Sequence, residues 1–149
     1  MFAVLGATGK TGRYLVERLC ADGHDVLAVG RSLERLEALG SDCRHALADF
    51  DHPVSVARAL VGARLVLSLV HARHTGILLD CLPSSCERLV LTGSTRRFTE
   101  LPDPAAAAVR TAETLFLSSG GPGVTPVGRA SRRGGGEHSV VAPPVKQQT

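Results

Sequence analysis

The chain has 149 residues, of which 44% are hydrophobic, 21% charged and only 3% aromatic, with a formal net charge of +3. These values predict one soluble domain whose core consists of Leu, Val and Ala. The basic excess lies in residues 120–149, so the body lacks the basic aromatic face of a nucleic-acid-binding protein. No apolar run approaches the roughly 20 residues of a membrane-spanning helix, and no secretory leader is visible, so a cytoplasmic location is expected.

The first two expected strands enclose a helix. Residues 2–5 and 26–29 are short apolar runs of the kind that form buried strands. A helix is expected between them, over residues 10–22, and Gly23 is placed to end it. The apolar residues of this helix recur at helical spacing: Leu15, Val16, Leu19 and Cys20.

The middle of the chain continues the alternation. Ser32 is placed to cap a short helix that ends at Gly40, and residues 43–48 form a weaker third strand. Asp51 and Pro53 are expected to open the next helix, because proline needs no N–H partner in a first turn. The residues of that helix expected to face the core are Val54, Ala57, Leu60 and Val61.

Two further strands and two helices complete the pattern. The run 65–70 is nearly all apolar, as expected of a parallel strand covered on both faces. A helix over residues 73–82 follows, then a fifth strand at 88–92. An alanine-rich helix opens at Asp103–Pro104 and ends before Gly120.

Strand and helix therefore alternate five times with short connections. This pattern predicts an α/β fold with a doubly wound parallel sheet in the strand order 3-2-1-4-5. A ligand crevice is expected at the carboxyl ends, where strands 1 and 4 diverge. Residues 1–119 are expected to form this domain, and the Gly-, Pro- and Arg-rich residues 120–149 an irregular or disordered tail. An edge strand at 124–127 and a basic tail that binds an acidic partner are the alternatives.

Three glycines at even spacing follow the first strand. Without a Cβ, glycine lets the backbone turn tightly and lets an anion approach the peptide N–H groups. A phosphate is favoured there by the positive end of the following helix. The strand–turn–helix setting predicts a dinucleotide-binding turn. Its expected contacts are Gly6, Thr8, Gly9, Lys10, Thr11 and Gly12.

The end of the second strand indicates which dinucleotide is bound. An acid there binds the ribose hydroxyls of NAD, whereas an arginine suits the 2′-phosphate of NADP. Arg31 and Ser32 occupy this position, and the nearest acid, Asp25, lies at the wrong end of the strand. Arg31 favours NADP, with Lys10 as a second phosphate contact and NAD as the alternative cofactor. The alternative interpretation is that Arg31 is a solvent-exposed loop residue with no role in binding.

Further cofactor contacts are expected at the ends of the third and fourth strands. Asp49 and Phe50 are placed to hold an adenine edge through the carboxylate, the alternative being an acid favoured by a helix N-terminus. Ser68, Leu69 and Val70 should lie under the cofactor if the topology is correct.

Other chemistry is less well supported. Residues 9–11 are similar to the end of an ATPase phosphate loop, but that motif needs a glycine where Val4 stands. His71 and His74 have helix-face spacing but no third metal ligand, and are expected at the surface or the pocket rim. The cysteines are expected to be free thiols rather than disulfide or metal ligands: Cys20, Cys43, Cys81 and Cys86.

With these features the chain resembles the short-chain dehydrogenase/reductase superfamily, in its atypical branch that is NmrA-like or nucleoside-diphosphate-sugar-epimerase-like. The GATGKTG turn at residues 6–12 is typical of that branch, and the likeness covers roughly residues 2–119. Residues 90–98 look like the family's fifth-strand segment, and residues 110–120 like the helix that leads to its sixth strand. The resemblance implies a Rossmann domain that binds NAD(P), and an oxidoreductase or epimerase-like activity on a small-molecule substrate.

The family's catalytic pair, Tyr-x-x-x-Lys, is not found in the sequence. The only tyrosine is Tyr14, in the first expected helix, and Arg110 stands near the lysine position with Ala106 four residues before it. Ser94 or Thr95 could position a substrate, but a hydroxyl alone is a poor proton donor. Two functions therefore stay open, an NADPH-dependent enzyme with an incomplete substrate site and a non-catalytic NAD(P)-sensing or regulatory protein.

The likeness to the family ends near Gly120, where its members continue through a sixth strand and a substrate-binding part. A truncated or frame-shifted gene product and a naturally shortened protein are both consistent with this ending. An incomplete domain with no function of its own is the third functional alternative.

Overall fold

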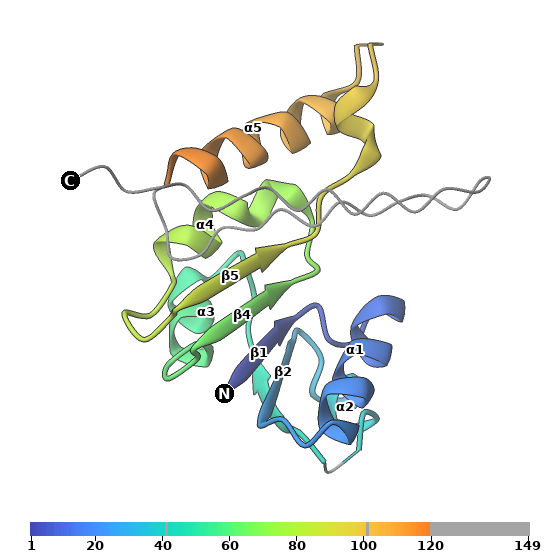
Figure 1. Cartoon of the computed structure of the whole chain (residues 1–149), viewed down its shortest axis with the longest axis vertical. Coiled ribbons are helices and arrows are strands. Elements are labelled where there is room, and N and C mark those ends of the chain that lie inside the picture. The colour runs from blue at the N-terminus through green and yellow to red at the C-terminus, as the bar shows by residue number, and fades with distance from the viewer. Residues whose placement is uncertain (41, 101, 120–149) are drawn as a thin grey trace.

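The computed structural model describes residues 1–40, 42–100 and 102–119. Five strands form one parallel sheet in the order β3-β2-β1-β4-β5, which confirms the predicted topology. Helices α1 and α2 cover one face of this sheet, and α3, α4 and α5 cover the other (Figure 1). The expected tail at 120–149, with its alternative strand at 124–127, lies outside the described residues.

The elements follow the predicted alternation, and most of them are shorter than predicted. The strands are β1 (Phe2–Leu5), β2 (Val26–Gly30), β3 (Arg44–Leu47), β4 (Leu65–Ser68) and β5 (Arg88–Leu91). The α-helices are α1 (Lys10–Ala21), α2 (Leu33–Glu37), α3 (Pro53–Ala59), α4 (Thr75–Asp80) and α5 (Pro104–Ser118). Two 3-10 helices, η1 (Ala72–His74) and η2 (Thr95–Phe98), precede α4 and α5.

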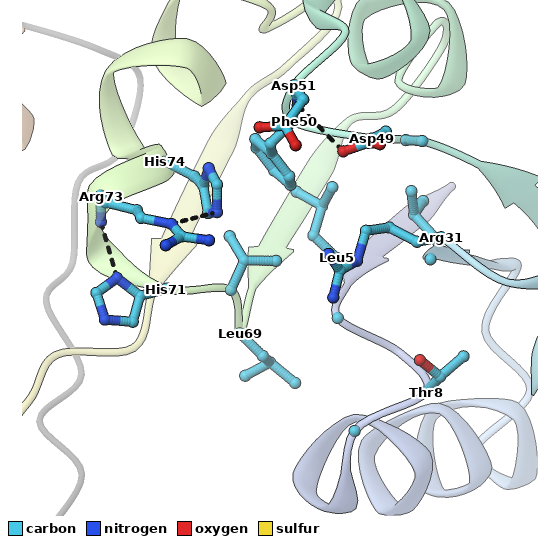
Figure 2. Close-up of a pocket in the computed structure, with 16 residues that line it drawn as sticks. Leu5, Thr8, Arg31, Asp49, Phe50, Asp51, Leu69, His71, Arg73 and His74 are labelled. Atoms are coloured by element: carbon cyan, nitrogen blue, oxygen red, sulfur yellow. Dashed lines mark hydrogen bonds between the residues drawn. The ribbon is translucent and has the colours of Figure 1, made fainter.

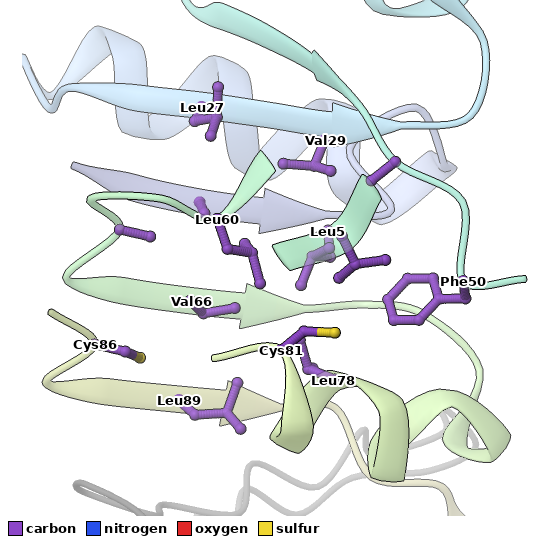
Figure 3. Packing of buried hydrophobic residues seen from close by; sticks show 14 of the residues in the cluster. Leu5, Leu27, Val29, Phe50, Leu60, Val66, Leu78, Cys81, Cys86 and Leu89 are labelled. Carbon is purple, nitrogen blue, oxygen red and sulfur yellow. The ribbon is translucent and has the colours of Figure 1, made fainter. Parts of the chain in front are cut away.

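The sheet separates two buried clusters because alternate residues of each strand point to opposite faces. In β1, Leu5 points into the larger cluster and Val4 into the smaller one. The larger cluster packs strand residues against Leu60 and Leu78 of the helical segments (Figure 3). Phe116 of α5 belongs to the same cluster. Burying each of these large apolar side chains contributes about 1.5–3 kcal/mol, so this face buries more apolar surface than the other.

Side chains and prolines define where the helices begin. The Ser32 hydroxyl accepts a hydrogen bond from the Arg35 backbone N–H at 3.3 Å, which confirms it as the cap of α2. Asp103 caps α5 in the same way, accepting from the Ala105 N–H at 2.9 Å. Proline occupies the first turn of both α3 and α5, but His52 rather than Asp51 is the cap of α3.

The predicted inner face of α3 is wrong at three of its four residues. Val54 and Val61 are 73% and 69% exposed, and Ala57 is also exposed. Leu60 is fully buried as predicted, and Val56, which was not predicted, is buried with it. Both sets have helical spacing, but only one stripe of a short helix can face the sheet, and periodicity alone does not choose between them.

The segment after β4 also differs from the prediction. The single helix expected over residues 73–82 is divided into η1 and the shorter α4. All four cysteines are free in the structure. Within the described ranges, no helix combines the length and the apolar character that crossing a membrane requires.

Candidate functional site

The turn between β1 and α1 is built on glycine. Gly6 has a φ of +78°, a left-handed conformation that suits glycine. The Gly9 N–H donates to the Gly6 carbonyl at 3.0 Å, and the Arg13 N–H donates to the Gly9 carbonyl at 2.9 Å, which begins the helix. A Cβ on Gly12 would overlap the Gly6 carbonyl oxygen and lie 2.7 Å from that of Ala7. Gly12 therefore allows helix and turn to pack in direct contact.

The start of α1 offers N–H groups to an anion. Gly9 is the N-cap and has no side chain to accept hydrogen bonds from the first turn. The first N–H groups of a helix have no partner within the helix. Together with the helix dipole, they favour a phosphate at this position.

A cleft of about 310 Å³ lies at the carboxyl ends of the first four strands. Figure 2 shows its side chains converging from the turn, from the end of β2, from the segment after β3 and from the segment after β4. This is the switch point of the strand order, where open α/β sheets bind ligands. Eight of the predicted site residues line it together: Gly6, Thr8, Gly9, Arg31, Asp49, Phe50, Leu69 and Val70.

Five predicted residues do not line the cleft, each for a structural reason. Gly12 is buried in the turn, and Lys10 and Thr11 lie exposed on the first turn of α1. Ser32 is engaged as the cap of α2. Ser68 is 3% exposed and contributes its carbonyl to hydrogen bonds from Thr92.

Arg31 places a positive charge at the edge of the cleft. Among the described residues, its exposed side chain has no hydrogen-bond or ion-pair partner. Several other arginines are paired, for example Arg44 with Asp25 at 2.6 Å and Arg64 with Glu87 at 2.7 Å. The Arg31 guanidinium is thus available to an anionic ligand.

A cluster after β4 supplies lining residues that the sequence did not assign to the cofactor. Arg73 donates through Nε to His74 Nε2 at 3.0 Å, and its backbone N–H donates to His71 Nδ1 at 3.2 Å. The His74 ring lies 4.7 Å from the Phe50 ring, forming an aromatic wall. Other lining residues not predicted are Leu5, Val29, Gly30, Ala48 and Asp51. These residues lie next to the predicted strand ends in the sequence, and this position was the signal that could have identified them as lining residues.

Partial burial lowers the pKa of His74 below its ordinary value, and the adjacent Arg73 lowers it further, while Asp51 opposes them. The folded state therefore takes up a proton at His74 less readily than the unfolded chain. Neutral His74 therefore contributes to the free energy of unfolding. This contribution is complete above about pH 6.5 and is lost as the pH falls below that value.

Acidification should therefore destabilise the wild type more than a variant that cannot titrate at this position. Between pH 7.5 and 5, we expect the free energy of unfolding to fall more steeply for the wild type than for His74→Gln. Urea denaturation at several pH values measures both slopes. Parallel slopes would show that His74 does not contribute to acid sensitivity.

The side chain near the family's lysine position has another role. Arg110 donates to the backbone carbonyls of Arg97 and Thr99 at 3.3 and 3.4 Å, which anchors η2 to α5. Tyr14 is 71% exposed on α1. In the described part of the chain, no three His, Cys, Asp or Glu side chains are grouped so that they could hold a metal.

The glycine turn and the switch-point cleft on a doubly wound sheet define the class of Rossmann-type dinucleotide-binding domains. Residues 6–123 match the NAD(P)H-binding family, and the chain belongs to it. Dinucleotide binding is therefore its function at this level. No curated protein matches the chain.

Solved structures share the fold at low sequence identity. The NADPH-dependent quinone oxidoreductase QOR2 of Escherichia coli, complexed with NADPH, is 19% identical with a TM-score of 0.69, covering 86% of this chain and 47% of that one. A nucleoside-diphosphate-sugar epimerase of Staphylococcus aureus is 17% identical with a TM-score of 0.70, covering 85% and 48%. The Citrobacter sp. triphenylmethane reductase complexed with NADP(H) is 17% identical with a TM-score of 0.69, covering 85% and 47%.

Together with the family match, these structures confirm the predicted NAD(P)-binding Rossmann-type fold. The chain spans about half the length of each of them. The likeness supports the fold, while the activity is a separate question.

Proposed function

We propose that the chain binds NADP(H) in preference to NAD(H), and that it acts as an NADPH-dependent oxidoreductase of the atypical short-chain dehydrogenase/reductase type. The observation that carries the preference is Arg31, an arginine without a partner among the described residues at the end of β2. A guanidinium at this position suits a 2′-phosphate, whereas an NAD site places an acid there.

The acids in the cleft do not replace the missing acid of β2. Asp49 and Asp51 lie beyond the end of β3, and Asp49 Oδ1 already accepts a hydrogen bond from the Asp51 N–H at 3.1 Å. His52 Nδ1 lies 3.8 Å from the other Asp49 oxygen. The Asp49 carboxylate is thus engaged with its own loop.

The residues present fit a dinucleotide in the following way. The N–H groups of the turn and the first turn of α1 hold the pyrophosphate, and Arg31 holds the 2′-phosphate. The tilted rings of Phe50 and His74 offer an aromatic surface for the adenine. The bound nicotinamide would supply hydride transfer, and the protein would orient it and keep water away. All the lining residues fall within positions 5–74, which supports assigning the binding domain to residues 1–119.

Titration of the purified chain with NADPH and NADH tests this proposal. Enhancement of nicotinamide fluorescence reports binding, and we expect NADPH to bind at least about tenfold more tightly, as for one charge-assisted contact. Tighter binding of NADH would contradict the role of Arg31. Failure to bind either nucleotide would exclude the proposed site as a whole.

A non-catalytic dinucleotide sensor is the second candidate. It is favoured by the exposed position of Tyr14 on α1 and by the engagement of Arg110 with backbone carbonyls, which leave no tyrosine–lysine pair at the described site. Turnover of NADPH with a panel of quinones and aldehydes separates the two functions. Consumption above the rate without protein supports the enzyme, and binding without consumption supports the sensor.

A further inference from the structure

The cysteines occupy two different environments. Cys81 and Cys86 are buried in the larger cluster. Each donates its thiol proton to a backbone carbonyl, Cys81 to Pro53 at 3.3 Å and Cys86 to Arg88 at 3.5 Å. Buried thiols with carbonyl partners are inert.

Cys20 and Cys43 are half-buried and lie against the smaller cluster on the other face of the sheet. Cys20 belongs to the last turn of α1, and Cys43 comes directly before β3. Although 22 residues separate them in the sequence, both side chains pack against this one cluster, and each thiol influences the pKa of the other. The sulfur atoms thus already lie close before any covalent bond forms.

An imidazole completes the group. His45 Nε2 lies 3.4 Å from the Cys43 sulfur and can accept its proton. The thiolate rather than the thiol is the nucleophile in disulfide exchange, so a neighbouring base assists the reaction. Two thiols and a base, partly open to solvent, have the chemistry of an exchange site.

We propose that Cys20 and Cys43 form a redox-active dithiol that exchanges with a low-molecular-weight disulfide such as oxidised glutathione. One cysteine thiolate attacks a glutathione sulfur, the glutathione S–S bond breaks, and the first glutathione leaves as a thiolate that takes up a proton. The second cysteine then attacks the protein sulfur of the mixed disulfide and releases the second glutathione. The dithiol is oxidised by two electrons, and glutathione disulfide is reduced to two thiols.

The new bond would join α1 to the start of β3 at the end of the sheet opposite the cleft. Cys20 lies ten residues beyond Lys10, about 15 Å along the helix from the turn. The closed segment includes β2, α2 and Arg31. Oxidation should therefore stabilise this half of the domain without blocking the cleft, and the proposal does not depend on cofactor binding.

Burial raises the pKa of both thiols; the charge of Asp42 raises the pKa of Cys20 further, and the neighbouring Cys20 raises that of Cys43. Thiolate is therefore scarce at neutral pH, and exchange accelerates as the solution becomes alkaline. A test at about pH 8.5 supplies more of the reactive form.

The full chain is equilibrated with reduced and oxidised glutathione, alkylated and mapped by mass spectrometry without reduction. We expect a linked peptide pair containing Cys20 and Cys43, alkylation of Cys81 and Cys86 after unfolding, and a Tm higher by on the order of 10 °C that falls on reduction. Cys20→Ser should lose the link and the thermal gain. Four alkylatable thiols, stable glutathione adducts without the link, or a link that includes Cys81 or Cys86 would each overturn the proposal.

Discussion

Replacement of Gly12 with alanine is expected to destabilise the domain by about 2 kcal/mol and to weaken dinucleotide binding by about 100-fold. The added Cβ would overlap the Gly6 carbonyl oxygen and crowd that of Ala7, and both are backbone atoms that cannot rotate away. Overpacking of this kind costs up to about 3 kcal/mol, and the better helix propensity of alanine returns at most about 1 kcal/mol. Opening the turn also moves the N–H groups that face the phosphate, each charge-assisted contact contributing about 1.5–3 kcal/mol.

Gly76→Ala is the matched control for this experiment. Gly76 also lies in a helix, α4, but a Cβ built there has no heavy atom within 4 Å. We expect this variant to unfold at an equal or slightly higher urea concentration and to bind the nucleotide normally. If Gly12→Ala behaves like Gly76→Ala in both assays, the close approach of helix and turn is not what the site requires.

Arg31→Ala should weaken NADPH binding selectively. Losing one guanidinium–phosphate contact of about 1.5–3 kcal/mol raises the Kd for NADPH roughly 10- to 150-fold. NADH has no 2′-phosphate, so its Kd should change less than about twofold. Fluorescence titration at one fixed ionic strength gives both constants, since salt weakens such contacts.

Arg35→Ala controls for the loss of one positive charge in the same region. Arg35 is an exposed residue of α2 that does not line the cleft. We expect Arg35→Ala to leave the NADPH and NADH affinities within about twofold of wild type, as for an exposed charge. An equal loss of both cofactors in Arg31→Ala would mean that this side chain maintains the shape of the cleft instead of recognising the phosphate.

The sheet and the turn were predictable because each depends on local sequence. Short apolar runs separated by helical segments require parallel strands, and the handedness of the crossovers then leaves few strand orders. The glycines of the turn were visible because their backbone conformations and contacts exclude side chains, as at Gly6 and Gly12. The switch-point rule then placed Arg31, Asp49 and Phe50 beside the turn.

The remaining part of the site depends on packing that periodicity does not describe. η1 turns His74 toward Phe50, and Arg73 then holds its ring through Nε2. Ser68 does not reach the cleft, because it lies within β4 and its side chain is buried. Ser32 was correctly predicted as a cap, and this role keeps its hydroxyl from the cleft. Predicting where these side chains point requires the three-dimensional orientation of short elements, which the sequence pattern does not provide.

The central position of β1 has a consequence for the order of folding. β1 pairs with β2 on one side, but its other partner is β4, with Phe2 opposite Leu65. At 5–20 residues per second, the ribosome adds these roughly 60 residues in about 3 to 12 seconds. During that interval one edge of β1 has no strand to pair with, and the long loop to β4 must close before the sheet is complete. β1, which leads into the cofactor turn, is thus synthesised early but gains its second partner strand late. Its unpaired edge is therefore most exposed while the chain is being synthesised.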